Sequence, residues 1–400
     1  MIEYWIWLAY SLDAATCHLK PLLDKYKSPK NIYKASISEL QSLYLLSQAE
    51  LKRLNNKGLD KAYEIIDECR ETKIDIVSYD DPEYPEALKN IPNPPAVLYR
   101  RGKLKNLNAL PLVCIIGARK VSDYGEKSAW SLAARLAAGK IVVVSGGAMG
   151  TDTAAHEGAL SVGGKTVAIV PCGLNYDYLK TNDFLRKVIS DSGCLISELP
   201  PKEPLHKNAF QVRNRLMSAL SMGVVIIEAS LKSGTMITAK YALEQGRDVF
   251  VVPGRPDDPN HEGSHQLLRE GATPIFSADD IFSEYVSRFP NIIDVDRAKS
   301  TNVSALYRNF HSPRMPEVEP VIAEILPEND KKVEKVKKNI EEGLPKNAEI
   351  VYNYLDKDVF TVDDLLLCDL SFEDVLSAVT QLELFGYIKA LPGGRYAIIY

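Results

Sequence analysis

The 400-residue sequence contains few residues of the kinds that build metal sites or disulfide frameworks. Its six cysteines, at positions 17, 69, 114, 172, 194 and 368, include no C-x-x-C pair, and its six histidines do not cluster. Structural zinc sites need paired Cys or His ligands, and closely spaced cysteines are typical of small secreted domains. We therefore expect no metal and no disulfides, with most cysteines buried as small apolar side chains.

The chain also lacks a long apolar run and an excess of positive charge. Its longest apolar opening, Ile2 to Leu12, is interrupted by Glu3 and is too short to span a bilayer, so we expect a cytoplasmic protein without membrane contact. The formal net charge is −5. Such a chain does not bind nucleic acid through bulk charge, so any polyanion site must be a local basic patch.

The sequence does contain ample material for a buried core. Hydrophobic residues make up 46% of it, and its length suits two to three domains. Between about 110 and 285, apolar runs alternate with helical patterns, which predicts an α/β fold with a Rossmann-like, mostly parallel, doubly wound sheet. The expected strands are Leu112–Ile116, Ile141–Val144, Thr166–Val170, Cys194–Ser197, Val224–Glu228 and Val249–Val252.

Four segments are expected along the chain. Residues 1–80 predict a small helical domain of the SAM or helix-hairpin type, because short amphipathic segments include a capping box at Ser47 and Glu50. Residues 81–286 contain the Rossmann-like domain. Residues 287–346 lose the apolar periodicity and become rich in charge, which predicts a linker.

Residues 347–400 predict a winged helix. Helices are expected at Ala348–Leu355, Val362–Leu367 and Phe372–Leu384, followed by a hairpin over Tyr387–Tyr400 that turns at Gly393-Gly394. This segment carries three basic residues against nine acidic ones, a balance of −6. A helix that reads DNA needs cations for the phosphates, so a protein contact or a structural role is favoured over DNA reading.

The most informative local pattern is a glycine-rich turn, V-V-V-S-G-G-A-M-G at 142–150, before Thr151-Asp152 opens a helix. Glycines allow close approach of a ligand, and a helix start presents free N–H groups to a phosphate. Glycine is also favoured at such turns when nothing binds, so a structural role stays open. The spacing G-G-x-x-G disfavours a nicotinamide dinucleotide, and Asp152 is expected to cap backbone amides. The candidates here are Ser145, Gly146, Gly147 and Gly150.

Three further loops at expected strand ends carry cations, amides or hydroxyls. Arg119 and Lys120 follow the first strand, and an arginine fork there suits phosphate. The motif F-Q-V-R-N-R at 210–215 precedes a helix and offers a stacking platform, two cations and an amide. The third loop contains Lys232, Ser233, Gly234 and Thr235. Each loop also has an interpretation without a ligand. This is a solvated arginine for the first loop, buried ion pairs for the second and a helix cap for the third.

No nucleophilic catalytic site is indicated. The sequence has no G-x-S-x-G elbow, and His156, which lies near the glycine turn, has no evident Ser or Cys partner. We expect His156 to be a packed residue, and we expect no catalytic residues and no cofactor.

Together these motifs resemble the DprA/Smf family, the DNA-processing protein A of bacteria. The resemblance covers about residues 82–280. It rests on I-I-G-A-R-K at 115–120, V-S-G-G-A-M-G-T-D at 144–152, A-A-H at 154–156, C-G-L-N-Y-D-Y-L-K-T-N at 172–182, S-E-L-P at 197–200, F-Q-V-R-N-R at 210–215, E-A-S-L-K-S-G-T-M-I-T-A at 228–239 and G-R-D-V-F-V-V-P-G at 246–254.

The resemblance implies a non-catalytic protein that binds single-stranded DNA, forms a homodimer and loads RecA recombinase during natural transformation. It makes Arg119 the leading DNA contact. Around it the resemblance implies Lys180, Arg213, Asn214 and Arg215. With the loop candidates, the expected DNA-binding residues also include Lys120, Ser145, Gly146, Gly147, Gly150, Asn182, Phe210, Lys232, Ser233, Gly234 and Thr235. Four positions depart from the family pattern without removing a cation: Ala118, Thr151, Leu179 and Gln211. We expect these departures to affect loop shape and affinity only.

The alternative is an enzyme, because the glycine turn also resembles the lysine-decarboxylase-like nucleotide phosphoribohydrolases. Those enzymes use a P-G-G-x-G-T-x-x-E loop whose glutamate acts on the ribose. Here the residue three positions after Thr235 is Thr238, not glutamate, which disfavours the enzyme.

Overall fold

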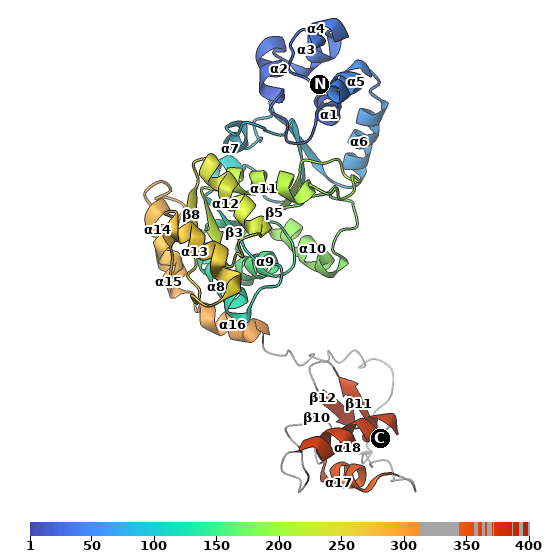
Figure 1. Ribbon diagram of the computed structural model, residues 1–400, viewed down its shortest axis with the longest axis vertical. Helices are drawn as coiled ribbons and strands as arrows, with labels where there is room; N and C mark the ends of the chain where they lie inside the picture. The colour runs from blue at the N-terminus through green and yellow to red at the C-terminus, as the bar shows by residue number, and fades with distance from the viewer. Residues whose placement is uncertain are drawn as a thin grey trace, which may run out of the picture. The chain divides into compact units, whose positions relative to one another are not determined.

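The structure is a computed structural model that describes residues 1–311, 344–355, 359–361, 365, 370, 372–385, 387–391 and 395–398. The chain divides into two compact units, Met1–Phe310 and His311–Tyr400. In the first unit a helical N-terminal part and a large sheet pack together (Figure 1).

The first unit is built on a nine-stranded sheet of order β1-β2-β6-β5-β4-β3-β7-β8-β9. From β6 to β9 all neighbours are parallel, and β1 and β2 add an antiparallel edge. This confirms the predicted Rossmann-like, mostly parallel sheet, and the six expected strands are present with bounds that differ by at most two residues. The strands are β1 Asp75–Ser78, β2 Val97–Gly102, β3 Leu112–Ile116, β4 Val142–Ser145, β5 Thr166–Ile169, β6 Cys194–Ser197, β7 Gly223–Ile226, β8 Asp248–Val251 and β9 Thr273–Pro274.

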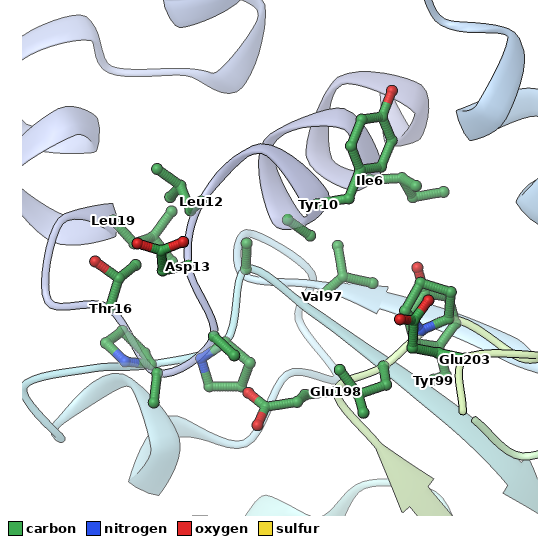
Figure 2. Close-up of a pocket in the computed structure, with 18 of the residues that line it drawn as sticks. Ile6, Tyr10, Leu12, Asp13, Thr16, Leu19, Val97, Tyr99, Glu198 and Glu203 are labelled. Atoms are coloured by element: carbon green, nitrogen blue, oxygen red, sulfur yellow. The ribbon is translucent and has the colours of Figure 1, made fainter. Parts of the chain in front are cut away.

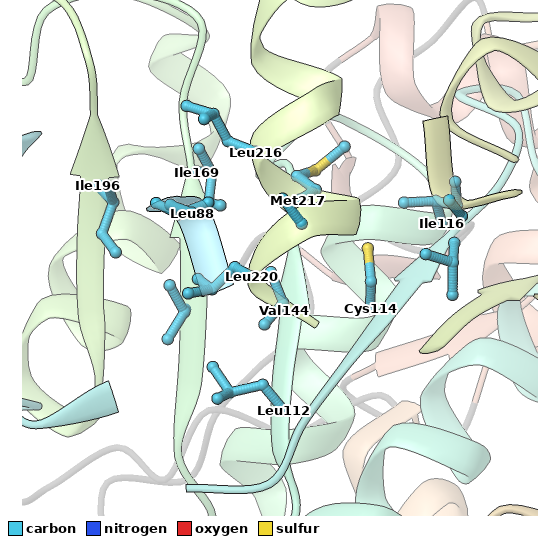
Figure 3. Packing of buried hydrophobic residues seen from close by; sticks show 14 of the residues in the cluster. Leu88, Leu112, Cys114, Ile116, Val144, Ile169, Ile196, Leu216, Met217 and Leu220 are labelled. Atoms are coloured by element: carbon cyan, nitrogen blue, oxygen red, sulfur yellow. The ribbon is translucent and has the colours of Figure 1, made fainter. Parts of the chain in front are cut away.

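Helices cover both faces of the sheet because consecutive side chains of each strand point to opposite sides. On one face, Val113 and Ile115 of β3 join a core with Trp130 of α8. On the other, Cys114 and Ile116 join Met217 of α11 (Figure 3). The helices of this region are α7 Glu86–Lys89, α8 Asp123–Ala138, α9 Thr151–Ser161, α10 Asp183–Ser192, α11 Ala209–Leu220, α12 Gly234–Glu244, α13 Glu262–Arg269 and α14 Ala278–Tyr285, with short 3₁₀ turns η1 Leu107–Ala109, η2 Lys180–Asn182 and η3 Pro259–His261.

The N-terminal helices share a core with the edge of the sheet. Trp5 and Leu8 of the first helix pack in the same cluster as Val97 and Tyr99 of β2. Strand β1 lies within the segment expected to be all helical, so continuous structure crosses the boundary expected at residue 80. The predicted capping box of Ser47 and Glu50 is present. The helices are α1 Ile2–Ser11, α2 Leu19–Tyr26, α3 Pro29–Lys34, α4 Ile37–Gln41, α5 Gln48–Asn55 and α6 Asp60–Glu71.

The segment expected to be a linker from residue 287 begins as ordered helix instead. Helices α15 (Val295–Ser300) and α16 (Val303–His311) follow the sheet domain. Arg135 of α8 donates a hydrogen bond from Nη1 to the Thr301 carbonyl at 3.0 Å, and Trp130 meets Tyr307 edge to face with ring centroids 5.2 Å apart. These contacts attach both helices to α8. Residues 312–343 of the expected linker lie outside the described residues.

The described part of the second unit contains two helices and a three-stranded antiparallel sheet. Helix α17 (Lys346–Tyr354) and α18 (Phe372–Leu384) pack around a core that includes Val351 and Leu382. Strands β10 (Val359–Thr361), β11 (Ile388–Leu391) and β12 (Arg395–Ile398) pair in the order β10-β12-β11, so β10 adds a strand to the predicted hairpin. Apart from Leu365, the helix expected at Val362–Leu367 and the turn at Gly393-Gly394 lie outside the described residues.

The expectations about cysteines, apolar segments and metal ligands can be compared with the described residues. Five cysteines fall within them; all are free thiols, and all except Cys17 are buried. No helix in these ranges is long and apolar enough to cross a bilayer, and no group of three or more His, Cys, Asp or Glu side chains there is placed to hold a metal ion.

Candidate functional site

The loops that carry the candidate residues meet at the carboxyl edge of the parallel sheet. The backbone N–H and Oγ1 of Thr151, at the start of α9, both donate to the Ala118 carbonyl at 3.1 Å. Thr235, at the start of α12, donates from Oγ1 to the Gly117 carbonyl at 3.0 Å. The turns after β3, β4 and β7 are therefore connected by hydrogen bonds, as expected where neighbouring parallel strands end together.

The glycine turn is shaped by its own protein neighbours. Gly147 and Gly150 have φ angles of 67° and 79°. A Cβ atom at Gly150 would lie 2.4 Å from the Arg119 carbonyl oxygen, and one at Gly146 would lie 1.8 Å from Nη1 of Arg213. Both glycines are needed so that the turn can approach the β3–α8 loop and a buried guanidinium.

Asp152 caps this turn from inside, as the sequence predicted. Its carboxylate accepts a hydrogen bond from the Ala148 amide at 3.2 Å, and its side chain is 8% exposed. Burial raises the pKa of Asp152, and the nearby Arg213 charge opposes that rise. This carboxylate already accepts a hydrogen bond from the turn. Fewer N–H groups of the turn are therefore free to bind an anion than the glycine pattern suggested.

The motif at 210–215 lies inside a helix, which corrects the expectation of a loop before one. Helix α11 begins at Ala209. Arg213 is 5% exposed and donates from Nη1 to the Ile169 carbonyl at 2.6 Å, and burial lowers its pKa. Arg215 is 1% exposed and donates from Nη2 to Glu198 Oε2 at 2.5 Å. Both arginines are therefore directed into the protein, not presented at its surface as direct contacts.

Arg119 is the exposed cation of the site, and the half-buried Phe210 ring lies beside it. The Arg119 guanidinium lies 4.3 Å from the centre of the Phe210 ring. The Phe210 ring is 6.1 Å from Tyr178, and Arg186 lies 6.0 Å from the Tyr178 ring. We call these four side chains the aromatic–cation row. Within the described residues, no carboxylate lies within ion-pair distance of Arg119, which is exposed.

The sequence pointed to two members of this row and missed the other two. Tyr178 lies in the Y-D-Y-L-K-T-N motif, which signalled only a lysine and an asparagine. Arg186 lies one turn into α10 and pairs with Asp183, so it resembles an ordinary surface ion pair. Burial raises the pKa of Tyr178, while the Arg213 and Arg119 charges oppose that rise. The tyrosine therefore stays a neutral ring.

The remaining candidates differ in how accessible they are. Lys120, Lys232 and Gly234 are exposed at the same edge of the sheet, and Ser233 is half-buried at the start of α12. Three candidates act within the protein: Ser145 donates to the Ile115 carbonyl at 2.7 Å, Asn182 to the Gly147 carbonyl at 3.3 Å, and Asn214 to the Gly234 carbonyl at 3.4 Å. The side chain of Lys180 lies outside the described residues.

The start of α8 is capped by the Ser122 hydroxyl, which accepts a hydrogen bond from the Gly125 amide at 3.0 Å, and a carboxylate that the sequence did not identify holds Ser122 in place. Glu228 follows β7, is fully buried, and accepts hydrogen bonds from the Ser122 amide at 3.1 Å and from the Ser122 hydroxyl. A Cβ atom at Gly125 would lie 2.3 Å from Glu228 Oε1, so glycine makes room for this contact. This helix start is thus satisfied within the protein.

Two residues bear on the enzyme alternative. His156 is fully buried beside Thr166, with Nδ1 2.7 Å from Thr166 Oγ1, and burial lowers its pKa to about 3. It is the packed, neutral residue that we expected. Thr238 is buried in α12 and donates to the Gly234 carbonyl at 3.3 Å, so no carboxylate occupies the position of the phosphoribohydrolase glutamate.

Comparison with known proteins gives consistent matches. Residues 75–286 match the sequence profile of the family described as DNA recombination-mediator protein A. The chain is 40% identical over 202 residues to DNA processing protein DprA of Streptococcus pneumoniae, covering 50% of this chain and 71% of that protein. It is 29% identical over 412 residues to protein Smf of Synechocystis, covering 98% of this chain and 97% of that one. The X-ray structure of DprA from Streptococcus pneumoniae matches with a TM-score of 0.60 at 31% identity, covering 71% of this chain and 98% of that chain.

Proposed function

Because the chain belongs to the DNA recombination-mediator protein A family, we propose that it binds single-stranded DNA at the carboxyl edge of its parallel sheet. The observation that carries the proposal is the exposed Arg119 guanidinium, 4.3 Å above the Phe210 ring and without an acidic partner among the described residues. An exposed arginine whose charge is not neutralised, held on an aromatic face, is suited to a phosphate or to a base.

The aromatic–cation row favours a single strand over a duplex. Aromatic faces bind bases that are already unstacked, and arginines beside them neutralise phosphates of a flexible backbone. Phe210 and Tyr178 supply the faces, while Lys120 and Lys232 extend the positive charge along the same edge. A paired duplex hides its base faces, so it gains only the phosphate contacts.

Arg213 and Asp152 are positioning residues in this proposal. The Arg213 guanidinium lies against Gly146, and the Asp152 carboxylate accepts a hydrogen bond from the Ala148 amide of the same turn. Their opposite charges partly compensate each other in the interior, which lets a buried cation support the turn. The strand itself contacts the aromatic–cation row.

We propose a binding protein and not an enzyme. The phosphoribohydrolase alternative needs a carboxylate three residues after Thr235, and the position holds the buried Thr238. The curated relatives are named as DNA processing proteins, which supports the same choice.

The wider role that we propose follows from family membership. A recombination mediator acts on strands destined for a recombinase, so we propose that the protein loads RecA onto incoming DNA during natural transformation, as a cytoplasmic homodimer. The second unit, with a balance of −6 over residues 347–400, is proposed to contact protein partners and not DNA.

The test is a fluorescence-anisotropy titration of the full chain with a labelled single strand and the matching duplex, at several salt concentrations. We expect the single strand to bind at least about tenfold more tightly, with an affinity that falls steeply as salt rises, because phosphate neutralisation releases counterions. Equal affinity for both forms, or none for either, contradicts the proposal.

A further inference from the structure

A cavity of about 420 Å³ lies between the N-terminal helices and the sheet (Figure 2). None of the four side chains of the aromatic–cation row lines it. Ile6 and Tyr10 of α1 form one wall, and Val97 and Tyr99 of β2 form another. Its volume falls in the range of roughly 300–1,000 Å³ that is usual for small-molecule sites. Of the candidate DNA-binding residues whose side chains the structure describes, only Arg215 lines it.

A buried ion pair forms the polar part of the cavity wall. Arg215 is 1% exposed and pairs with Glu198, which also lines the cavity and keeps 11% of its side-chain surface exposed. Within the described residues, Nε and Nη1 of Arg215 have no hydrogen-bond acceptor. Buried donors without acceptors are costly, so a ligand that supplies an acceptor is stabilised there.

The charged side chains that line the cavity balance in number, with Arg53, Lys61 and Arg215 against Asp13, Glu198 and Glu203. Asp13 pairs with Arg53, and Glu203 lies 2.8 Å from the His206 imidazole. Lys61 lies over the Tyr10 ring at 5.0 Å. Each carboxylate of the lining therefore has a basic neighbour, and the cavity favours a neutral group over a free ion.

From this pairing we propose that the cavity binds a nucleobase. The Arg215–Glu198 pair presents hydrogen-bond donors next to a carboxylate acceptor, and each nucleobase carries a donor beside an acceptor on its edge. Pro95, Pro200 and Tyr10 supply flat apolar surface for the faces of the ring. The base is neutral, as the matched charges of the lining require.

The base has two possible sources, a free nucleoside or a bound DNA strand. A second, apolar hollow of about 220 Å³ shares Ala14, Glu198, Leu199 and His206 with the first. It continues to Val170 at the end of β5 and to Ala209 at the start of α11, next to Phe210 in sequence. This continuity would give a base of a bound strand a route from the row. The proposal does not depend on DNA binding at Arg119.

The experiment measures binding of the four deoxynucleosides by calorimetry, to the full chain and to variants in which a larger side chain fills the cavity. We expect at least one to bind with a dissociation constant of about 1 mM or tighter. Ala9→Trp and Ala14→Trp place a ring in the cavity and should weaken binding at least tenfold. Ala49→Trp, on an exposed position of α5 in the same helical part, is the matched control and should change it less than twofold. Ala14 is exposed in a loop, so its variant stays informative if Ala9→Trp fails to fold.

A second arm identifies the source of the base. If the strand supplies it, Ala14→Trp weakens binding of an intact oligonucleotide but not of the same oligonucleotide with abasic sites. If free nucleosides are the ligand, Ala14→Trp weakens only nucleoside binding. If nucleosides still bind to the Arg119→Ala variant, the cavity is a binding site separate from the aromatic–cation row. The proposal is overturned if neither nucleosides nor the oligonucleotide respond to the cavity-filling variants.

Discussion

Arg119 and Arg213 lie near the same edge of the sheet, but only Arg119 is exposed to solvent. Arg213 uses Nη1 for the Ile169 carbonyl, and burial lowers its pKa. Arg119 is held against Phe210 instead. A phosphate can contact Arg119 directly, whereas Arg213 acts on a ligand only through its charge and through the turn above it.

Arg119→Ala should therefore weaken single-strand binding by about 1–3 kcal/mol, because it removes a direct phosphate or base contact. The melting temperature should stay nearly unchanged, since the described residues place no carboxylate within ion-pair distance of this guanidinium. Anisotropy titration and thermal unfolding by circular dichroism measure the two effects. Arg70→Ala, on an arginine of α6 that is 75% exposed, is the matched control for loss of one positive charge. Early melting with intact affinity would instead make Arg119 a structural residue.

Gly150→Ala should destabilise the fold. The residue has a φ of 79° and a ψ of −126°, and a Cβ atom there would lie 2.4 Å from the Arg119 carbonyl oxygen. Backbone strain of this kind costs about 1–3 kcal/mol, and the steric clash adds to it. Chemical denaturation measures the loss. Gly234→Ala, where a Cβ atom meets nothing within 4 Å, is the control and should change stability by less than about 0.5 kcal/mol. A tolerated alanine at residue 150 would contradict this account of the turn.

Among the elements, helix α11 determines which of its arginines a ligand can reach. Because helix α11 begins at Ala209, Phe210 and Arg213 are one turn apart. They lie on the face of the helix that is directed toward the carboxyl edge of the sheet. Arg215 lies on another side and meets Glu198. From the sequence, both arginines were expected in a loop before a helix, either as ligand contacts or in buried ion pairs, because the polar residues of the motif resemble a loop. No local pattern reveals a partner 17 residues earlier in the chain.

The other elements could be predicted where a local sequence pattern marks them, and could not where contacts between distant residues stabilise them. Strands β3 to β8 could be predicted because runs of Val and Ile mark strands buried on both faces. Helices α15 and α16 could not, because their short segments become stable only through contacts with α8 such as the Arg135 hydrogen bond. The meeting of Arg119 and Phe210 joins two loops distant in sequence, so it required the three-dimensional packing.

His156 connects α9 to β5 through Thr166 and makes stability depend on pH. Burial lowers its pKa from 6.5 to about 3, so below pH 6.5 the unfolded chain binds a proton that the folded chain does not. Stability therefore falls as the pH decreases from about 6.5 toward 3, by up to about 1.4 kcal/mol per pH unit from this group. His156→Gln should show a shallower loss in urea unfolding at pH 7, 6 and 5. Equal slopes in both proteins would show that this histidine is not the titrating group.

At the scale of the whole molecule, the helical N-terminal part and the sheet form one compact unit. Asn175, in the loop after β5, donates to Glu68 of α6 at 2.7 Å, and Lys202 lies 3.5 Å from the same carboxylate. The N-terminal helices thus support loops at the carboxyl edge where the aromatic–cation row lies. A ligand in the cavity beside Arg215 would contact both parts at once.

Removal of residues 347–400, the larger part of the second unit, should leave single-strand binding intact. Residues 347–400 carry three basic and nine acidic residues, so they offer few cations to phosphate and their loss can only reduce repulsion. A chain that ends at Lys346 keeps the whole first unit, Met1–Phe310, with its own core. Its single-strand affinity should match that of the full chain within about 0.5 kcal/mol, because the aromatic–cation row is retained. Anisotropy titration measures this, with circular dichroism to show folding and light scattering to compare the oligomeric state. A tenfold loss of affinity in a folded protein of unchanged oligomeric state would mean that the second unit contacts DNA despite its charge.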